Sequence, residues 1–290
     1  MFAEERQMLV LSLLEKRNSV TVAELSEALQ VTEATVRRDL NALQARGLVI
    51  RTHGGAILPP ATGFEPTYSE KEDRYFEEKQ KIGFKAAELI KPGETIILDA
   101  GTTTLHIARH LEGKRGITVI TNGLNLVHEL TRIEGIEVVF TGGTARFNTM
   151  ALVGPIAQET LRNFHADKVF LAGNGISLAH GLTTPSVLEA YTKRAMADAA
   201  REVIVVVDHS KFNVVTATRV LPLSRVHKII TDDGLPASVR LEFAAAGAEI
   251  IVAGEADTAS LRGDGPSARL KTQDNDRNAK PRAGQGLVGR

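Results

Sequence analysis

The 290-residue sequence contains no cysteine and no tryptophan, and aromatic residues make up only 4% of it. Without cysteine the chain can form neither disulfides nor cysteine-ligated zinc sites, which suits a reducing compartment, and we expect a cytoplasmic protein. The sequence has no apolar run of about 18 residues, the length that a membrane-spanning helix needs. Its charged start at Glu4, Glu5 and Arg6 differs from a signal peptide.

The chain also has no excess of either charge, because 35 basic residues balance 35 acidic ones. Whole-chain charge therefore does not indicate a nucleic-acid-binding protein, and any such indication must be local. The eight histidines show no metal-ligand spacing. We expect His106 on a helix surface, His110 at a helix end and His209 in a loop, with no metal site and no cofactor.

Residues 21–40, TVAELSEALQVTEATVRRDL, have the pattern of two short helices joined by a tight turn. Thr21 and Glu24 have the spacing of a capping box at the start of the first helix. Thr32 can cap the second helix, which carries the adjacent pair Arg37 and Arg38. This arrangement is typical of a helix-turn-helix, whose second helix enters the DNA major groove.

The residues on this second helix divide between two faces. Val36, Leu40 and Leu43 have the spacing of a buried stripe. An upstream helix from about Glu4 to Lys16 completes a small core, for which the candidates are Met8, Leu9, Leu11, Leu13 and Leu14. The residues predicted to contact DNA from the opposite face and its flanks are Thr32, Glu33, Thr35, Arg37, Arg38 and Asn41.

A small β wing follows this helix. The sequence LVIRTHGGAIL predicts two short strands around residues 53–55, with Arg51 and His53 as further DNA contacts. An ordinary helical hairpin with a charged, solvated face is the alternative, and the arginine pair together with the wing favours DNA binding. Because the basic patch is local, affinity of a single copy should be weak, and we expect a homo-oligomer, a dimer or tetramer, on a double-stranded operator.

Composition divides the chain into four segments. We predict a winged helix-turn-helix domain over residues 1–58, a linker over 59–75 that starts with PPATGFEP, a larger domain over 76–254 and a disordered tail over 255–290. A charged helix is expected from about Ser69 to Ile90.

The larger segment alternates β-rich apolar runs with amphipathic stretches. The expected strands are 95–98, 117–120, 136–140, 168–171, 203–207, 228–230 and 249–252. The expected helices between them include 105–111, 124–130, 187–200 and 239–246. This alternation predicts an α/β domain with a mostly parallel sheet covered by helices on both faces, preceded by the small α+β winged domain.

The loops that follow these strands are rich in glycine and polar residues. Ligands of open α/β sheets bind at the carboxyl ends of the strands, and glycines and helix N-termini admit anions. The candidate effector-binding residues are Asp99, Gly101, Thr102, Thr103, Thr104, Asn122, Gly142, Gly143, Asn174 and Lys211. Amides, threonines and a lysine suit a phosphate, and Asp99, Asn122 and Asn174 suit hydroxyl groups. Each loop could instead be a helix cap or an ordinary turn.

The sequence resembles the DeoR family of bacterial transcription regulators from about Glu4 to Gly254. In the first domain TVRRDLNAL and RTHGGA carry the resemblance, and in the second DAGTTT, TN, TGG, the NG loop and DHSKF carry it. The family implies a sensor domain for sugar phosphates, similar to ribose-5-phosphate isomerase and CoA transferase folds. It further implies a repressor of a sugar or polyol operon, released from DNA by a phosphorylated effector.

An isomerase-like enzyme with an appended DNA-binding domain is the alternative function. Asp99 and Asp208 could serve as a general base, but residues 172–175, AGNG, lack the acidic residue that ribose-5-phosphate isomerases use there. We therefore expect a sensor without catalytic residues. Glu189 and Lys193 have the i, i+4 spacing of a surface salt bridge, with an interface or ligand role as the alternative.

Overall fold

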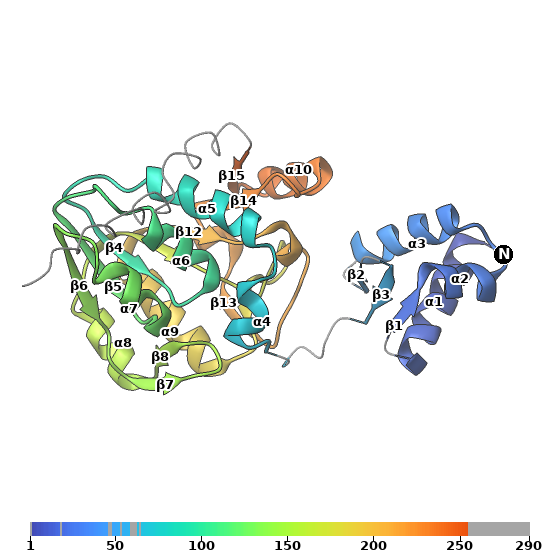
Figure 1. Ribbon diagram of the computed structural model, residues 1–290, viewed down its shortest axis with the longest axis horizontal. Coiled ribbons are helices and arrows are strands. Elements are labelled where there is room, and N and C mark those ends of the chain that lie inside the picture. Colours follow the sequence, from blue (N-terminus) through green and yellow to red (C-terminus); the bar gives the residue numbers. More distant parts are fainter. Residues whose placement is uncertain are drawn as a thin grey trace, which may run out of the picture.

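The computed structural model describes residues 2–17, 19–45, 48–52, 54–58, 63 and 65–254 (Figure 1). His53, Arg46 and the segment 255–290 lie outside the described residues, so the expectations placed on them stay predictions. None of the described helices combines the length and apolar character needed to cross a bilayer.

The N-terminal unit is a winged helix-turn-helix (Figure 1). Its helices are α1 (Ala3–Arg17), α2 (Val22–Leu29) and α3 (Glu33–Ala45). Its strands are β1 (Ser19–Thr21), β2 (Ile50–Thr52) and β3 (Gly55–Ile57), which form an antiparallel sheet in the order β1-β3-β2. The predicted helix pair and wing are therefore both present.

Local capping fixes the turn between α2 and α3. The predicted capping box is present: the amide of Glu24 donates to Thr21 Oγ1 (3.1 Å), and the amide of Thr21 donates to Glu24 Oε2 (2.7 Å). Gln30 ends α2 in the left-handed conformation with φ 53°. The Thr32 hydroxyl accepts from the Thr35 amide (3.3 Å) at the start of α3. These contacts satisfy helix-end amides that have no partner within the helix.

The core of this unit differs from the prediction on α1. Val36, Leu40 and Leu43 are buried as predicted. Leu14 is buried as predicted, and Leu11 and Leu13 are partly buried against the core. Met8 and Leu9 are 64% and 44% exposed, however, and Val10, which was not among the candidates, is buried. Residues 8–14, MLVLSLL, include six apolar residues and one serine, and helix periodicity alone did not fix which face turned inward.

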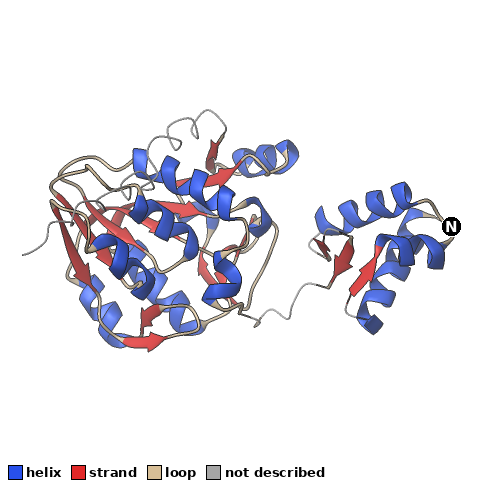
Figure 2. Ribbon diagram, in the orientation of Figure 1, coloured by secondary structure: helices blue, strands red, loops and turns tan. Residues whose placement is uncertain are grey.

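The larger unit is built on a seven-stranded parallel sheet in the order β15-β14-β12-β9-β4-β5-β6 (Figures 1 and 2). The strands are β4 (Thr95–Leu98), β5 (Ile117–Thr121), β6 (Ile136–Phe140), β9 (Ala166–Leu171), β12 (Ala200–Val206), β14 (Lys228–Asp232) and β15 (Glu249–Ala253). All seven predicted strands belong to this sheet.

Helices cover both faces of the sheet, which confirms the predicted fold class. Alternate residues of each strand face opposite sides, so Ile96 and Leu98 belong to one apolar core and Ile97 to the other. The helices over the first core are α5 (Phe76–Glu88), α6 (Thr102–Arg109) and α7 (Val127–Leu130), which follows a short 3-10 helix, η1 (Leu124–Leu126). The helices over the second core are α8 (Pro155–Arg162), α9 (Val187–Asp198) and α10 (Ala237–Ala245).

Short elements were not predicted. A hairpin of β7 (Thr144–Arg146) and β8 (Ala151–Val153) follows β6, and β10 (Gly175–Ser177), β11 (Gly181–Thr184) and β13 (Thr218–Leu221) form a separate antiparallel sheet. Two further 3-10 helices, η2 (His209–Lys211) and η3 (Leu223–Arg225), lie in loops. Runs of three or four residues are too short to show a period.

The single helix predicted from about Ser69 to Ile90 is wrong. The chain forms α4 (Tyr68–Glu72) and α5, and Tyr75 between them has φ 54°. The Tyr75 ring lies edge-on to the ring of His209, 5.0 Å away. A contact with a loop far along the chain therefore accompanies the break, and no local sequence signal marks it.

The loop that follows β6 approaches strand β8 closely at Gly143. Its φ is +117°, and a Cβ there would lie 2.6 Å from the carbonyl oxygen of Val153. Gly113 also has a positive φ, +81°, but has no atom within 4 Å of a Cβ. We expect Gly113→Ala to lower the free energy of unfolding by about 1 kcal/mol and Gly143→Ala by about 3 kcal/mol. Urea unfolding measures both losses, and equal losses would contradict the close approach.

Candidate functional site

The outer face of α3 is the candidate DNA-reading surface. Thr32, Glu33, Arg37, Arg38 and Asn41 are exposed and Thr35 is half-buried, whereas Val36 and Leu40 face the core. The sequence therefore assigned the two faces of α3 correctly. Solvent exposure of this face is what insertion into a major groove requires.

The two arginines of α3 differ in their surroundings. Arg37 forms an i, i+4 ion pair with Glu33, with 2.8 Å between Nη2 and Oε2. Arg38 has no hydrogen bond or ion pair with any described residue. Its guanidinium is therefore available to a base edge or a phosphate without first breaking an intramolecular contact.

Arg51 connects the wing to α3. Its Nη1 donates to Asn41 Oδ1 (2.7 Å) and to the carbonyl oxygen of Arg37 (3.3 Å). The sequence predicted Arg51 and Asn41 as DNA contacts but did not show that they contact each other. The link fixes the position of the wing strand against the reading helix.

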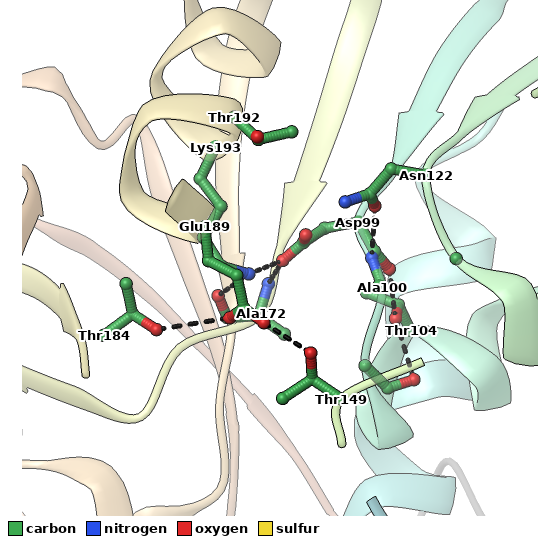
Figure 3. Close-up of polar contacts among 12 residues, drawn as sticks. Asp99, Ala100, Thr104, Asn122, Thr149, Ala172, Thr184, Glu189, Thr192 and Lys193 are labelled. Atoms are coloured by element: carbon green, nitrogen blue, oxygen red, sulfur yellow. Dashed lines mark hydrogen bonds and ion pairs between the residues drawn. The ribbon is translucent and has the colours of Figure 1, made fainter. Parts of the chain in front are cut away.

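The carboxyl ends of β4, β5, β6, β9 and β12 bring most of the candidate effector residues to one edge of the sheet. Strand order places β4 between β5 and β9, so the loops after these three strands are neighbours. Asp99 follows β4, Asn122 follows β5 and Ala172 follows β9 (Figure 3). This edge is where ligands of open parallel sheets bind.

Asp99 is the central charged group of this edge. It is 1% exposed, and its Oδ2 accepts from the Ala172 amide (3.0 Å) and forms an ion pair with Lys193 Nζ (Figure 3). Burial raises the pKa of Asp99, and the ammonium of Lys193 offsets part of that rise. The pair joins the end of β4 to α9.

The threonine run forms the first turn of α6. Gly101 precedes the helix, and a Cβ on it would lie 2.9 Å from the Cβ of Ala172. The Thr104 hydroxyl lies 2.6 Å from the carbonyl oxygen of Asp99 and 3.1 Å from that of Gly101. Thr102 and Thr103 are buried. The amides of this first turn have no acceptor within the helix and carry the positive end of its dipole.

Asn122 has two structural partners. Its Oδ1 accepts from the Ala100 amide (2.8 Å), and its Nδ2 donates to the carbonyl oxygen of Leu152 on β8 (3.0 Å). The predicted role of this amide in binding hydroxyl groups therefore competes with its role in holding the Asp99 loop against the β7–β8 hairpin. Gly142 and Gly143 have φ values of +66° and +117° and connect β6 to that hairpin.

Asn174 belongs to a hydrogen-bonding group that includes Glu189. The Thr184 hydroxyl lies 3.1 Å from Asn174 Oδ1. It also lies 3.4 Å from Glu189 Oε2 (Figure 3). Glu189 also accepts from the Thr149 hydroxyl (2.5 Å) and from Arg146 Nη1 (2.6 Å).

The default interpretation of Glu189 and Lys193 as a surface salt bridge is wrong. Both side chains are buried, and Lys193 pairs with Asp99 while Glu189 pairs with Arg146. Burial raises the pKa of Glu189, but Lys193, Thr149 and Arg146 together lower it below its ordinary value. The i, i+4 spacing placed both residues on one face of α9, and the sheet edge supplied partners that the sequence could not show.

Several lysines gather near this edge. Lys211 Nζ lies 3.7 Å from Asp208 Oδ2 and 3.1 Å from Ser210 Oγ. Burial lowers the pKa of Lys71, and the charges of Lys193 and Lys211 lower it further. Burial, with Lys211 and Lys71, lowers the pKa of Lys79 to about 8. Sequence reasoning missed Lys71, Lys79 and Lys193, because their approach depends on tertiary packing.

The position of His106 differs from the prediction, whereas that of His209 agrees with it. His106 is buried rather than on a helix surface, and burial lowers its pKa to about 4. His209 lies in a loop as expected, where its Nδ1 is 2.7 Å from Asp232 Oδ2, and this hydrogen bond raises the pKa of His209. Within the described ranges, no three His, Asp or Glu side chains are grouped to hold a metal ion.

Removal of Lys193 tests the central ion pair. We expect Lys193→Met to lower the free energy of unfolding by about 3–5 kcal/mol, because it leaves the Asp99 carboxylate buried without a cation. The double variant Asp99→Asn with Lys193→Met should recover a large part of that loss. Urea unfolding of the parent, single and double variants measures both effects. If the double variant lost as much stability as the sum of two independent changes, the two groups would not interact.

Comparison with known families follows this division of the chain. Residues 6–62 match the DeoR-like helix-turn-helix domain, and residues 75–233 match the DeoR C-terminal sensor domain. The putative aga operon transcriptional repressor of Escherichia coli O157:H7 is 36% identical over 253 residues, covering 87% of this chain and 94% of that protein. The HTH-type transcriptional repressor GlcR of Bacillus subtilis (strain 168) is 38% identical over 232 residues, covering 80% and 89%.

Among solved structures, ribose 5-phosphate isomerase from Plasmodium falciparum is similar with 14% identity and a TM-score of 0.35, covering 46% of this chain and 52% of that one. That similarity is too low to support an argument about function. The sequence relatives above are named as transcription regulators rather than enzymes, in agreement with the prediction made from residues 172–175. On the two domain matches and these identities, the chain belongs to the DeoR family of transcription regulators.

Proposed function

We propose that the chain represses a sugar or polyol operon in the cytoplasm and leaves its operator when a phosphorylated sugar binds at the carboxyl edge of the sheet. The observation that carries the proposal is the presence of two chemically different sites on one chain. One is an exposed basic helix face, and the other is the carboxyl edge of the sheet, where Asp99 pairs with Lys193 and where burial together with the charges of neighbouring lysines lowers the pKa of Lys71 and Lys79. The relatives named as repressors, one of them of the aga operon, support this function.

The DNA contacts are proposed to come from α3 and the wing. Arg38 is the residue best placed for a base edge, since its guanidinium has no partner among the described residues. Thr32, Thr35 and Asn41 supply shorter polar contacts, Glu33 and Arg37 flank the groove, and Arg51 and His53 contact phosphates from the wing. A single module reads about half of an operator, so two copies would bind two half-sites related by a two-fold axis.

The effector contacts are proposed to divide between phosphate and sugar. The amides of Thr102, Thr103 and Thr104, together with the Thr103 hydroxyl and Lys211, would bind the phosphoryl oxygens. Asp99 would accept from hydroxyl groups beside its partner Lys193, and the amides of Asn122 and Asn174 would accept from or donate to them. Gly101, Gly142 and Gly143 let the backbone approach the ligand. A dianion also relieves the repulsion among the lysines, which favours a phosphate ester over a neutral sugar.

Binding of effector can release DNA only if the effector prefers one arrangement of the chain over another. The proposal is therefore thermodynamic: the phosphorylated sugar binds more tightly to the DNA-free form than to the operator-bound form. By linkage, operator DNA must weaken effector binding by the same factor.

Arg38→Ala tests the reading face. We expect the variant to fold like the parent and to lose at least about tenfold in affinity for DNA from its own promoter region, because a groove-facing charge is removed. Fluorescence anisotropy at fixed salt measures the affinity. The matched control is Arg17→Ala, which removes an exposed arginine of α1 and should change affinity little. Equal affinities of Arg38→Ala and the parent would contradict the assignment of α3.

Lys211→Ala and Thr103→Ala test the effector site. We expect both variants to bind promoter DNA like the parent but to need at least about tenfold more sugar phosphate for release, because a phosphoryl contact is lost. The titrants are glycerol, fructose, tagatose and deoxyribose phosphates, and release is followed by anisotropy. Lys91→Ala, at an exposed lysine before β4, is the control. Release of both variants at the parent's concentration would show that the site is misplaced.

A further inference from the structure

The segment that leads from the DNA-binding module into the sensor is attached to the β7–β8 hairpin. The amide of Tyr68, the first residue of α4, donates to the carbonyl oxygen of Asn148 in the hairpin turn (2.8 Å). A capping box of Thr67 and Glu70 starts α4, and Lys79 Nζ donates to the carbonyl oxygen of Lys71. Only residues 59–64 separate this segment from the end of the wing in sequence.

Arg146 is the strongest of these attachments. Its Nη2 lies 2.6 Å from one carboxylate oxygen of Glu65, and its Nη1 lies 3.3 Å from the other. The guanidinium therefore binds that carboxylate in a bidentate arrangement. The same Nη1 lies 2.6 Å from Glu189 Oε1. One cation on the hairpin thus holds one carboxylate from the linker segment and one from α9.

The second carboxylate connects this contact to the candidate effector site. Glu189 shares the Thr184 hydroxyl with Asn174, and the charge of Lys193, the partner of Asp99, acts on Glu189. A ligand that touches Asn174 or Lys193 therefore lies next to the carboxylate that Arg146 holds.

The two carboxylates are not equivalent. Glu189 is fixed on three sides by Thr149, Thr184 and Arg146 within the folded sensor. Among the described residues Glu65 pairs with Arg146 alone, and it lies at the start of the linker segment 65–72 with 10% of its side chain exposed. Of the two, Glu65 is the partner that can return to water with little rearrangement.

We propose, building on the function proposed above, that Arg146 is a shared ligand. The phosphoryl group of the effector, which the α6 amides and Lys211 also hold, takes the Arg146 guanidinium from Glu65 and thereby releases the segment Glu65–Glu72. A phosphate monoester carries close to two negative charges at neutral pH and matches the guanidinium fork as well as a carboxylate does. It therefore outcompetes a single carboxylate for the same cation. Freeing this segment changes how the DNA-binding module is tethered, which couples occupancy of the sensor to operator affinity.

Glu65→Gln in the full chain tests the competition, because it removes the rival anion and keeps the side-chain size. We expect the variant to bind the sugar phosphate that releases the parent at least about threefold more tightly by isothermal titration calorimetry. Release from promoter DNA should shift to lower concentration by a similar factor. Glu159→Gln, at an exposed ion pair of α8, is the matched control and should leave both values unchanged.

Hydrogen exchange on the parent provides a second measurement that needs no variant. We expect amides of residues 65–72 to exchange faster when the sugar phosphate saturates the chain, and Glu65→Gln to show faster exchange there without ligand. Release of DNA with no change in exchange at 65–72, or an unchanged affinity in Glu65→Gln, would overturn the shared-ligand proposal and leave the proposed function standing. If none of the four sugar phosphates bound the parent, the proposed function would fall, and this inference with it.

Discussion

The buried ion pair between Asp99 and Lys193 is the interaction on which the sensor edge depends. It ties the end of β4 to α9, and Asp99 also receives the amide of Ala172 after β9. A buried ion pair stabilises a fold only when the two charges are well oriented and their remaining hydrogen-bonding groups have partners. That condition fixes two loops of the edge and α9 relative to one another.

Polar groups around this pair form a continuous path rather than isolated contacts. Glu189 lies beside Lys193 on α9, Arg146 holds Glu189 from the hairpin, and Glu65 brings in the segment that follows the DNA-binding module. Neighbouring groups on this path are charged and contact one another, so an anion that binds at the edge changes the electrostatic interactions along the path. In the N-terminal unit the corresponding link is Arg51, which fixes the wing to the reading helix through Asn41. Both units thus use an arginine to join two elements, the wing and α3 in the first and the linker segment and α9 in the second.

Sequence patterns were sufficient where local physics decides the structure. The capping box at Thr21, the buried stripe of α3 and the seven apolar strands all follow from spacing and propensity, and each is present in the fold. The patterns failed where distant residues meet. Tyr75 breaks the predicted helix beside the ring of His209. His106 is buried where a glycine of α5 packs closely against it. Lys193 and Arg146 lie in elements whose sequence gives no sign of the sheet edge, so their partners became known only from the fold.

The central claim is that the sheet edge recognises the phosphoryl group and that its occupancy controls DNA binding. The most direct measurement titrates the promoter-bound chain with matched pairs, each a free sugar or polyol and its phosphate ester, at constant ionic strength. The account predicts that at least one ester releases the DNA at a concentration where its unphosphorylated partner has no effect. Equal release by both members of that pair, or retention of DNA with every ester, would contradict it.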